Sequence, residues 1–169
     1  MIAAKRLAAF SIVIAAILFE TSNQSLGASA IAKSPDQIEG KTYRLERAFL
    51  ISVHIPSASV NRVLQSLTAA VGLEYGSYAQ VAYVDAEGVE QFRSLAGSKD
   101  GAQKEVDKVP SKVVTVSVIH DTAVLQKALD AINQAHSYEE PVIYITEGWR
   151  NRSTSPDEQN PNRWWNQQH

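Results

Sequence analysis

The chain has 169 residues, of which 44% are hydrophobic and 20% are charged, an ordinary composition for one globular domain with a hydrophobic core. Its formal net charge at pH 7 is −2, so the sequence gives no reason to expect nucleic acid or an anionic membrane as a partner. There is no cysteine, which excludes disulfides, thiolate metal sites and cysteine nucleophiles.

The N-terminus resembles an export signal. Lys5 and Arg6 precede an apolar run over residues 7–19, and small residues follow at 28–30 in the sequence "ASA". This order of basic, apolar and small residues is typical of a cleaved signal peptide. We therefore expect a signal peptide over 1–30, cleavage after Ala30, a periplasmic or secreted product, and no stable membrane anchor afterwards. An uncleaved N-terminal anchor is the alternative, although the run is short for a membrane span.

A polar segment over 31–44, which contains Pro35 and Gly40, is expected to be a flexible leader. The folded domain is predicted over 45–148. Its first strand is the apolar run 48–55, ended by Pro56, and its continuous hydrophobicity favours burial on both faces.

From residue 59 to 71 the apolar residues recur at helical spacing, which predicts an amphipathic helix. Ser57 or Ser59 could accept a hydrogen bond at its start, and Gly72 could end it in a left-handed conformation. The predicted buried stripe is Val60, Val63, Leu64, Leu67, Ala70 and Val71.

The middle of the chain reads as a β-hairpin, with strands at 78–85 and 89–95 joined by the turn "AEG". Residues 96–111 are rich in Gly, Ser, Lys and Asp and are expected to form an exposed loop. The β-branched run 112–119 predicts the next strand.

A second helix follows, which Asp121 can cap. After it comes a last strand over 142–146. The order β-α-β-β-α-β predicts an α+β, ferredoxin-like domain, in which two helices cover one face of an antiparallel sheet. The predicted stripe of the second helix is Val124, Leu125, Ala128, Leu129, Ile132 and Ala135.

The polar tail over 149–169 carries a pair of tryptophans. Most of a tail this polar should be flexible. Trp164 and Trp165 are expected to dock on an apolar groove of this subunit or of a neighbour, with a disordered end as the alternative.

The segment "HSYEEP" at 136–141 is the densest group of chemically active side chains. His136 and Glu139 could provide two ligands for Zn²⁺ or Cu²⁺, but a firm site needs three or four. Pro141 pushes Glu140 toward an extended conformation, so the two glutamates should diverge and cannot work as an acid–base pair. The alternative is a structural corner, in which His136 satisfies the end of the helix and Tyr138 packs beneath it.

The rest of the chain shows no nucleotide fingerprint and no nucleophile-elbow motif. Arg93 could bind an anion, or could be a solvated hairpin residue. His54 and His120 are expected to be structural or surface residues, and we expect no catalytic residues.

Two segments resemble a known family. The sequence "HSYEEPVIYI" resembles the H-P-Y-E-E-P segment of a domain of the YqfO-type interacting-factor proteins, and "EGVEQFRSLAGS" resembles that domain's G-x-G-Q-F-R-P-x-x-G hairpin. The similarity covers about residues 48–145. Ser137, Glu90 and Ser94 depart from the family pattern, and the separate domain that carries the family's paired-metal ligands is missing, so hydrolase activity should not be transferred.

The same domain is akin to the CutA divalent-cation-tolerance proteins and the P-II signalling proteins, and the "NRWWN" tail is also similar to CutA. The resemblance implies a ferredoxin-like homotrimer with sheet edges paired between subunits, and it links the chain to copper or other divalent metals such as zinc. The candidate residues are Gln91, Arg93, Tyr138 and Glu140 for ligand binding, and His136 and Glu139 for metal. The expected function is an exported, non-enzymatic domain that binds a divalent metal or small ligand at a subunit interface; the alternative is a structural or protein-interaction module.

Overall fold

The computed structural model describes residues 34–155 and 159–167. The predicted signal peptide over 1–30 lies outside the described residues. None of the helices in the described ranges is long and apolar enough to cross a membrane. The helices and strands are β1 (Tyr43–Pro56), α1 (Val60–Val71), β2 (Tyr83–Val84), β3 (Gly88–Phe92), β4 (Asp107–Ile119), α2 (Thr122–Ala135) and β5 (Ile143–Ser153).

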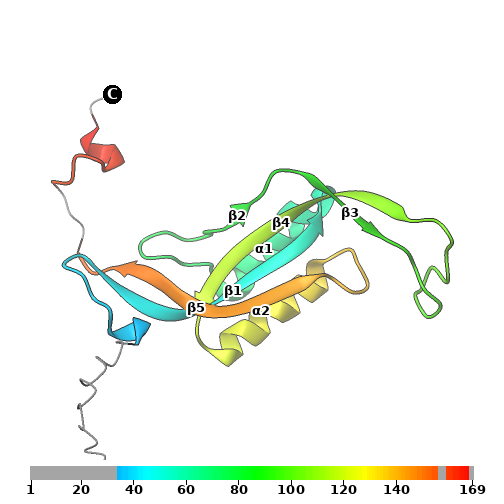
Figure 1. Ribbon diagram of the computed structural model, residues 1–169, viewed down its shortest axis with the longest axis horizontal. Helices are drawn as coiled ribbons and strands as arrows, with labels where there is room; N and C mark the ends of the chain where they lie inside the picture. The colour runs from blue at the N-terminus through cyan, green and yellow to red at the C-terminus, as the bar shows by residue number, and fades with distance from the viewer. Residues whose placement is uncertain (1–33, 156–158, 168–169) are drawn as a thin grey trace, which may run out of the picture. The chain divides into compact units, whose positions relative to one another are not determined.

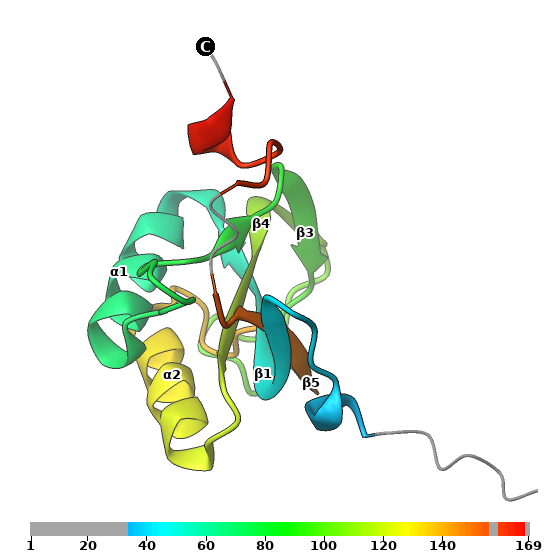
Figure 2. The same cartoon turned by 90° about the vertical axis from the view of Figure 1, so that its left-hand side faces the viewer.

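The strands form one antiparallel sheet in the order β2-β4-β1-β5, with β3 also paired to β4. Both helices lie on the same side of this sheet (Figures 1 and 2). This arrangement confirms the predicted α+β, ferredoxin-like fold.

The hairpin predicted at 78–95 is wrong in its pairing. Strands β2 and β3 do not pair with each other, because both pair with β4, at Val114–Thr115 and at Asp107–Ser111 respectively. They are two segments of one interrupted edge strand. The true hairpin is β3–β4, and β4 therefore begins at Asp107, inside the stretch expected to be an exposed loop.

Strand β1 is not buried on both faces as predicted. Its odd-numbered residues Phe49, Ile51, Val53 and Ile55 are buried, whereas Leu50 is 36% exposed. The reason is that helices cover one face of the sheet, and the other face has no second layer among the described residues. This strand thus carries apolar residues on both faces, although only one face of the sheet is covered within the described ranges. Residue type alone could not reveal that the second face is uncovered.

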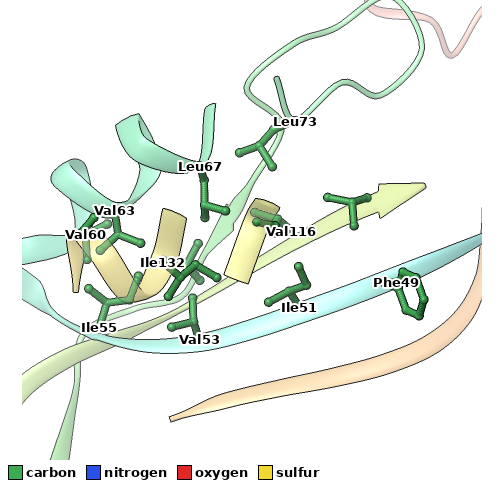
Figure 3. Packing of buried hydrophobic residues seen from close by; sticks show 14 residues of the cluster. Phe49, Ile51, Val53, Ile55, Val60, Val63, Leu67, Leu73, Val116 and Ile132 are labelled. Atoms are coloured by element: carbon green, nitrogen blue, oxygen red, sulfur yellow. The ribbon is translucent and has the colours of Figure 1, made fainter. Parts of the chain in front are cut away.

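The core lies between the helices and the covered face of the sheet. Val63 and Leu67 of α1 and Ile132 of α2 point toward Ile51 and Val53 of β1 (Figure 3), and each of these five residues is fully buried. Complete burial of an aliphatic side chain contributes about 1.5–3 kcal/mol, so this layer is the main source of stability.

The ends of the helices are capped partly as predicted. Gly72 ends α1 with φ +70°, and the Asp121 carboxylate accepts hydrogen bonds from the N–H groups of Ala123 and Val124 at 2.7 and 3.1 Å. The predicted serine cap of α1 is wrong, because neither Ser57 nor Ser59 caps it through its side chain. The Ser59 hydroxyl instead donates to Ser137 at 3.3 Å.

The strands extend beyond the predicted domain limits. Strand β5 continues to Ser153 and pairs with β1 back to Tyr43. The leader is also partly ordered, since it forms a short 3-10 turn at Pro35–Gln37 and a bridge from Glu39 to Arg44. In the described tail, Trp164 and Trp165 are 67% and 41% exposed and stack edge-to-face on each other; their docking on a groove stays a prediction.

Candidate functional site

The corner between α2 and β5 is organised around His136, which is buried. Its Nε2 lies 2.8 Å from the carbonyl oxygen of His54, and its Nδ1 lies 2.9 Å from the backbone nitrogen of Tyr138. A carbonyl can only accept and a backbone N–H can only donate, so Nε2 carries the proton and Nδ1 is the acceptor. His136 is therefore a neutral imidazole that ties the exit of the helix to β1.

This arrangement does not support His136 as a metal ligand. Both ring nitrogens already form hydrogen bonds, so a metal ion could bind only by breaking one of them and leaving a buried backbone group without a partner. Nor does His136 satisfy the end of the helix with its ring, as the structural interpretation expected. The Nε of Arg62 does so instead, by donating to the carbonyl of Ala135 at 2.8 Å.

The two glutamates of the corner are exposed. Glu139 accepts a hydrogen bond from the backbone N–H of Lys99 at 3.2 Å, which anchors the loop between β3 and β4 to the corner. Glu140 has no hydrogen bond or ion pair among the described residues. The structure therefore does not bring Glu139 and His136 together as a pair of ligands.

Tyr138 joins the corner to the β3–β4 hairpin. Its ring packs edge-on against His136 and Phe92, with centroids 5.1 and 5.3 Å apart. Its hydroxyl is buried beside Ser111 and Glu90 but forms no hydrogen bond of good geometry. Burial raises the pKa of Tyr138 above 10.0, and the Glu90 carboxylate adds to this effect while Ser111 opposes it.

Sequence reasoning missed the role of Glu90, whose side chain is 13% exposed. Its Oε1 lies 3.5 Å from Nδ1 of His54, and its Oε2 accepts from the Ser111 hydroxyl at 3.4 Å. Serine and histidine thus both face the carboxylate, whereas a nucleophilic triad needs the serine to face the histidine. The register of β3 against β4 places Glu90 here, and a long loop hides that register from the sequence.

Gln91 and Arg93 lie on the same hairpin and are exposed. Alternation along β3 places Gln91 on the opposite face from Glu90 and Phe92, so Gln91 points away from the corner. Arg93 has no hydrogen bond or ion pair among the described residues. The two motifs do meet in space, where the predicted binding residue Tyr138 contacts Phe92 and Glu90, but Gln91, Arg93 and Glu140 take no part in this contact.

The fold has relatives among solved structures. A Bacillus cereus protein related to NIF3 aligns with a TM-score of 0.52 and 19% identity over 62% of this chain and 26% of that chain. CutA1 from Oryza sativa aligns with a TM-score of 0.43 and 10% identity over 61% of this chain and 81% of that chain. The periplasmic divalent cation tolerance protein CutA from Archaeoglobus fulgidus gives a TM-score of 0.39 and 13% identity, covering 59% and 81%.

No family model matches the sequence, and no curated protein matches it significantly. The chain spans about a quarter of the NIF3-related protein, and at 19% identity the likeness shows a shared fold and no activity. The comparison therefore confirms the ferredoxin-like fold implied by the sequence resemblance, and it carries no information about activity.

Proposed function

We propose that this chain is an exported, non-enzymatic, self-associating domain, which forms a homotrimer through its sheet edges and takes its ligand at a subunit interface. The observation that carries the proposal is that both edges of the sheet lack a partner strand within the described residues and expose apolar side chains. Unpaired edges of this kind are prone to pair with another chain.

The first edge is β5, which pairs with β1 alone (Figure 1). The N–H of His54 donates to Val142, and the N–H of Thr154 donates to Thr42. Hydrogen-bonded pairs alternate along an antiparallel ladder, so even-numbered residues of β5 face β1 and odd-numbered residues direct their backbone groups outward. Ile145 and Trp149 are among the latter, and their side chains are 45% and 42% exposed.

The opposite edge is formed by β2 and β3, which pair with β4 alone. It exposes Tyr83, Val89 and Phe92, by 68%, 67% and 38%. The two edges differ, so pairing one with the other is a head-to-tail contact between subunits. Such a contact closes into a ring when the rotation between subunits fits, and the family resemblance favours a ring of three.

The described residues of a single subunit do not provide a fitting metal site. No group of three or more His, Cys, Asp or Glu side chains within the described ranges is placed to hold a metal ion, and zinc sites use three or four protein ligands. We therefore place divalent metal binding between subunits, where the exposed Glu139 and Glu140 could contribute carboxylates.

The alternative is a protein-interaction module without a ligand. Its support is the exposed pair Trp164 and Trp165, which stack on each other beside Arg163, because aromatic residues and arginine are enriched in interaction surfaces. This alternative predicts a monomer that binds a different protein.

Native mass spectrometry of the exported protein tests the proposal, and the expected result is the mass of three subunits. Ile145→Pro should give a folded monomer, because the lost N–H faces the free edge. Thr146→Pro is the matched control and should disrupt the fold, because its N–H faces β1. As a second variant, Val89→Lys places a charge on the opposite edge. A wild-type monomer, or trimers of both folded edge variants, would contradict the proposal.

The same spectra recorded with Zn²⁺ or Cu²⁺ test the metal. Uptake by the trimer and not by the Ile145→Pro monomer is expected for a site between subunits, and equal uptake by both would argue against it.

N-terminal sequencing of protein recovered from the periplasm or medium tests export. A mature chain that starts at Ile31 is expected, and an intact Met1 would contradict cleavage.

A further inference from the structure

A cavity of about 320 Å³ lies at the other end of the sheet, where α1 ends and α2 begins. Its volume is near the lower limit of small-molecule sites. Its apolar wall comes from the two helix ends and from β4, and it consists of Ala70, Val71, Leu73, Val118, Ile119 and Val124. Leu73 lies just beyond α1, on the covered side of the sheet (Figure 3).

Most of the charged residues in the lining come from β1 and β5. Arg150 is the most enclosed group, since its side chain is 7% exposed. Its Nε donates to Glu46 at 2.8 Å and its Nη1 donates to the Ser117 hydroxyl at 3.2 Å. The guanidinium also lies 5.4 Å from the Tyr75 ring centre, so it is held in one position before any ligand arrives.

Arg152 lies beside it with donors to spare. Its Nε is 3.3 Å from the same Glu46 oxygen, and its guanidinium also contacts the Tyr75 ring, 5.6 Å from the centre. Its terminal nitrogens have no hydrogen-bond partner among the described residues, and neither has the ammonium of Lys127. Both residues line the cavity.

The charges of the lining are not balanced. The lining contains three cationic side chains, Lys127, Arg150 and Arg152, and two carboxylates, Glu46 and Glu74. Glu46 is shared by both arginines. One positive charge is left over, with free donors from a guanidinium, whose planar fork matches a carboxylate. An inorganic anion would satisfy these donors but would leave the apolar wall without a partner.

From these contacts we infer that the cavity binds a small organic carboxylate, whose anionic group meets Arg152 and Lys127 and whose apolar body packs on Val118 and Val124. All of these residues belong to one subunit and lie away from the corner around His136, although Arg150 and Arg152 stand on β5, the strand whose outer edge is proposed to pair with a neighbour. Arg150 holds Glu46 in place, and Glu46 in turn positions Arg152.

Titration of the ¹⁵N-labelled protein with hexanoate, followed by amide chemical shifts, tests this inference. Saturable shifts are expected at Leu73, Val118 and Val124. 1-Hexanol, which has the same chain without the charge, should bind at least about tenfold more weakly, since it loses a charge-assisted hydrogen bond. Inorganic phosphate should shift these amides less than hexanoate does.

Variants then assign the donors. Arg152→Gln and Lys127→Gln should each weaken hexanoate binding about tenfold, and Arg93→Gln is the matched control, because it removes an exposed arginine from the remote hairpin. The inference is overturned if hexanol binds as well as hexanoate, if phosphate binds better, if no saturation is reached, or if Arg93→Gln weakens binding as much as Arg152→Gln does.

Discussion

The two ends of the sheet use their polar groups differently. At the corner after α2, both ring nitrogens of His136 are occupied by backbone partners, so the polar groups stabilise the fold. At the opposite end, Arg150 is satisfied by Glu46 and Ser117, but the terminal nitrogens of Arg152 are not. The proposed carboxylate site uses the spare hydrogen-bonding groups beside the cavity, whereas the hydrogen-bonding groups of His136 are already used to hold the corner together.

The largest effect is expected at the corner. Replacement His136→Ala leaves the carbonyl of His54 and the N–H of Tyr138 without partners and opens a small void, so the free energy of unfolding should fall by about 2–4 kcal/mol. Denaturant unfolding measures this change. The control Glu140→Gln changes an exposed neighbour and should stay within about 0.5 kcal/mol; an equal loss in both variants would show that the corner does not depend on His136.

A smaller loss of stability is expected at the charged end. Arg150→Met removes the enclosed partner of Glu46, but Glu46 is 27% exposed and keeps Arg152 at 3.3 Å. The free energy of unfolding should therefore fall by about 1–3 kcal/mol, less than for a fully buried pair. Unfolding of Glu46→Gln provides the matched control. A larger loss of unfolding free energy in Arg150→Met than in His136→Ala would contradict the expectation that the corner around His136 contributes more to stability than the charged end does.

Alkaline pH probes the buried hydroxyl of Tyr138. Burial raises its pKa above 10.0, so the folded state keeps its proton at a pH where the unfolded state has lost it. The free energy of unfolding should then fall as the pH rises above 10.0, until the raised pKa is passed. Tyr138→Phe should lack this part of the decrease in unfolding experiments across that range, and identical slopes would exclude burial of the hydroxyl.

The smallest effects are expected for the exposed residues of the hairpin motif. Gln91→Ala and Arg93→Gln should each change the free energy of unfolding by less than about 0.5 kcal/mol. Native mass spectrometry of the same variants shows whether they act between subunits. If either variant is monomeric and loses much more stability than this limit, the replaced side chain makes packing contacts in spite of its exposure, and the prediction is wrong.

The sequence predicted the elements that depend on local chemistry. Helical spacing located both helices, Gly72 and Asp121 marked two of their ends, and the order of the elements predicted the layers of the fold. These features need information from only a few neighbouring residues. The predicted ends of the strands were less accurate, because pairing with neighbouring strands, rather than local composition, determines how far β1, β4 and β5 extend.

The candidate site depended on pairing at long range and was harder to predict. Glu90 reaches His54 because β3 pairs with β4 across a loop, and the sequence does not contain that register. Arg150 and Arg152 stood in a segment that appeared to be a polar tail, since the chain beyond residue 148 is rich in Asn, Ser and Arg. Only the pairing of β5 with β1 shows that Arg150 and Arg152 lie on the same face of the sheet as Glu46.

Denaturant unfolding of two variants, with and without hexanoate, tests the contrast between the ends most directly, because a ligand that binds the folded state stabilises it more the tighter it binds. His136→Ala should be less stable than the wild type yet gain as much stability from hexanoate. Arg152→Gln should keep most of its stability and gain less from hexanoate. The opposite pattern, with the hexanoate effect lost in His136→Ala and retained in Arg152→Gln, would place binding at the corner and contradict the account.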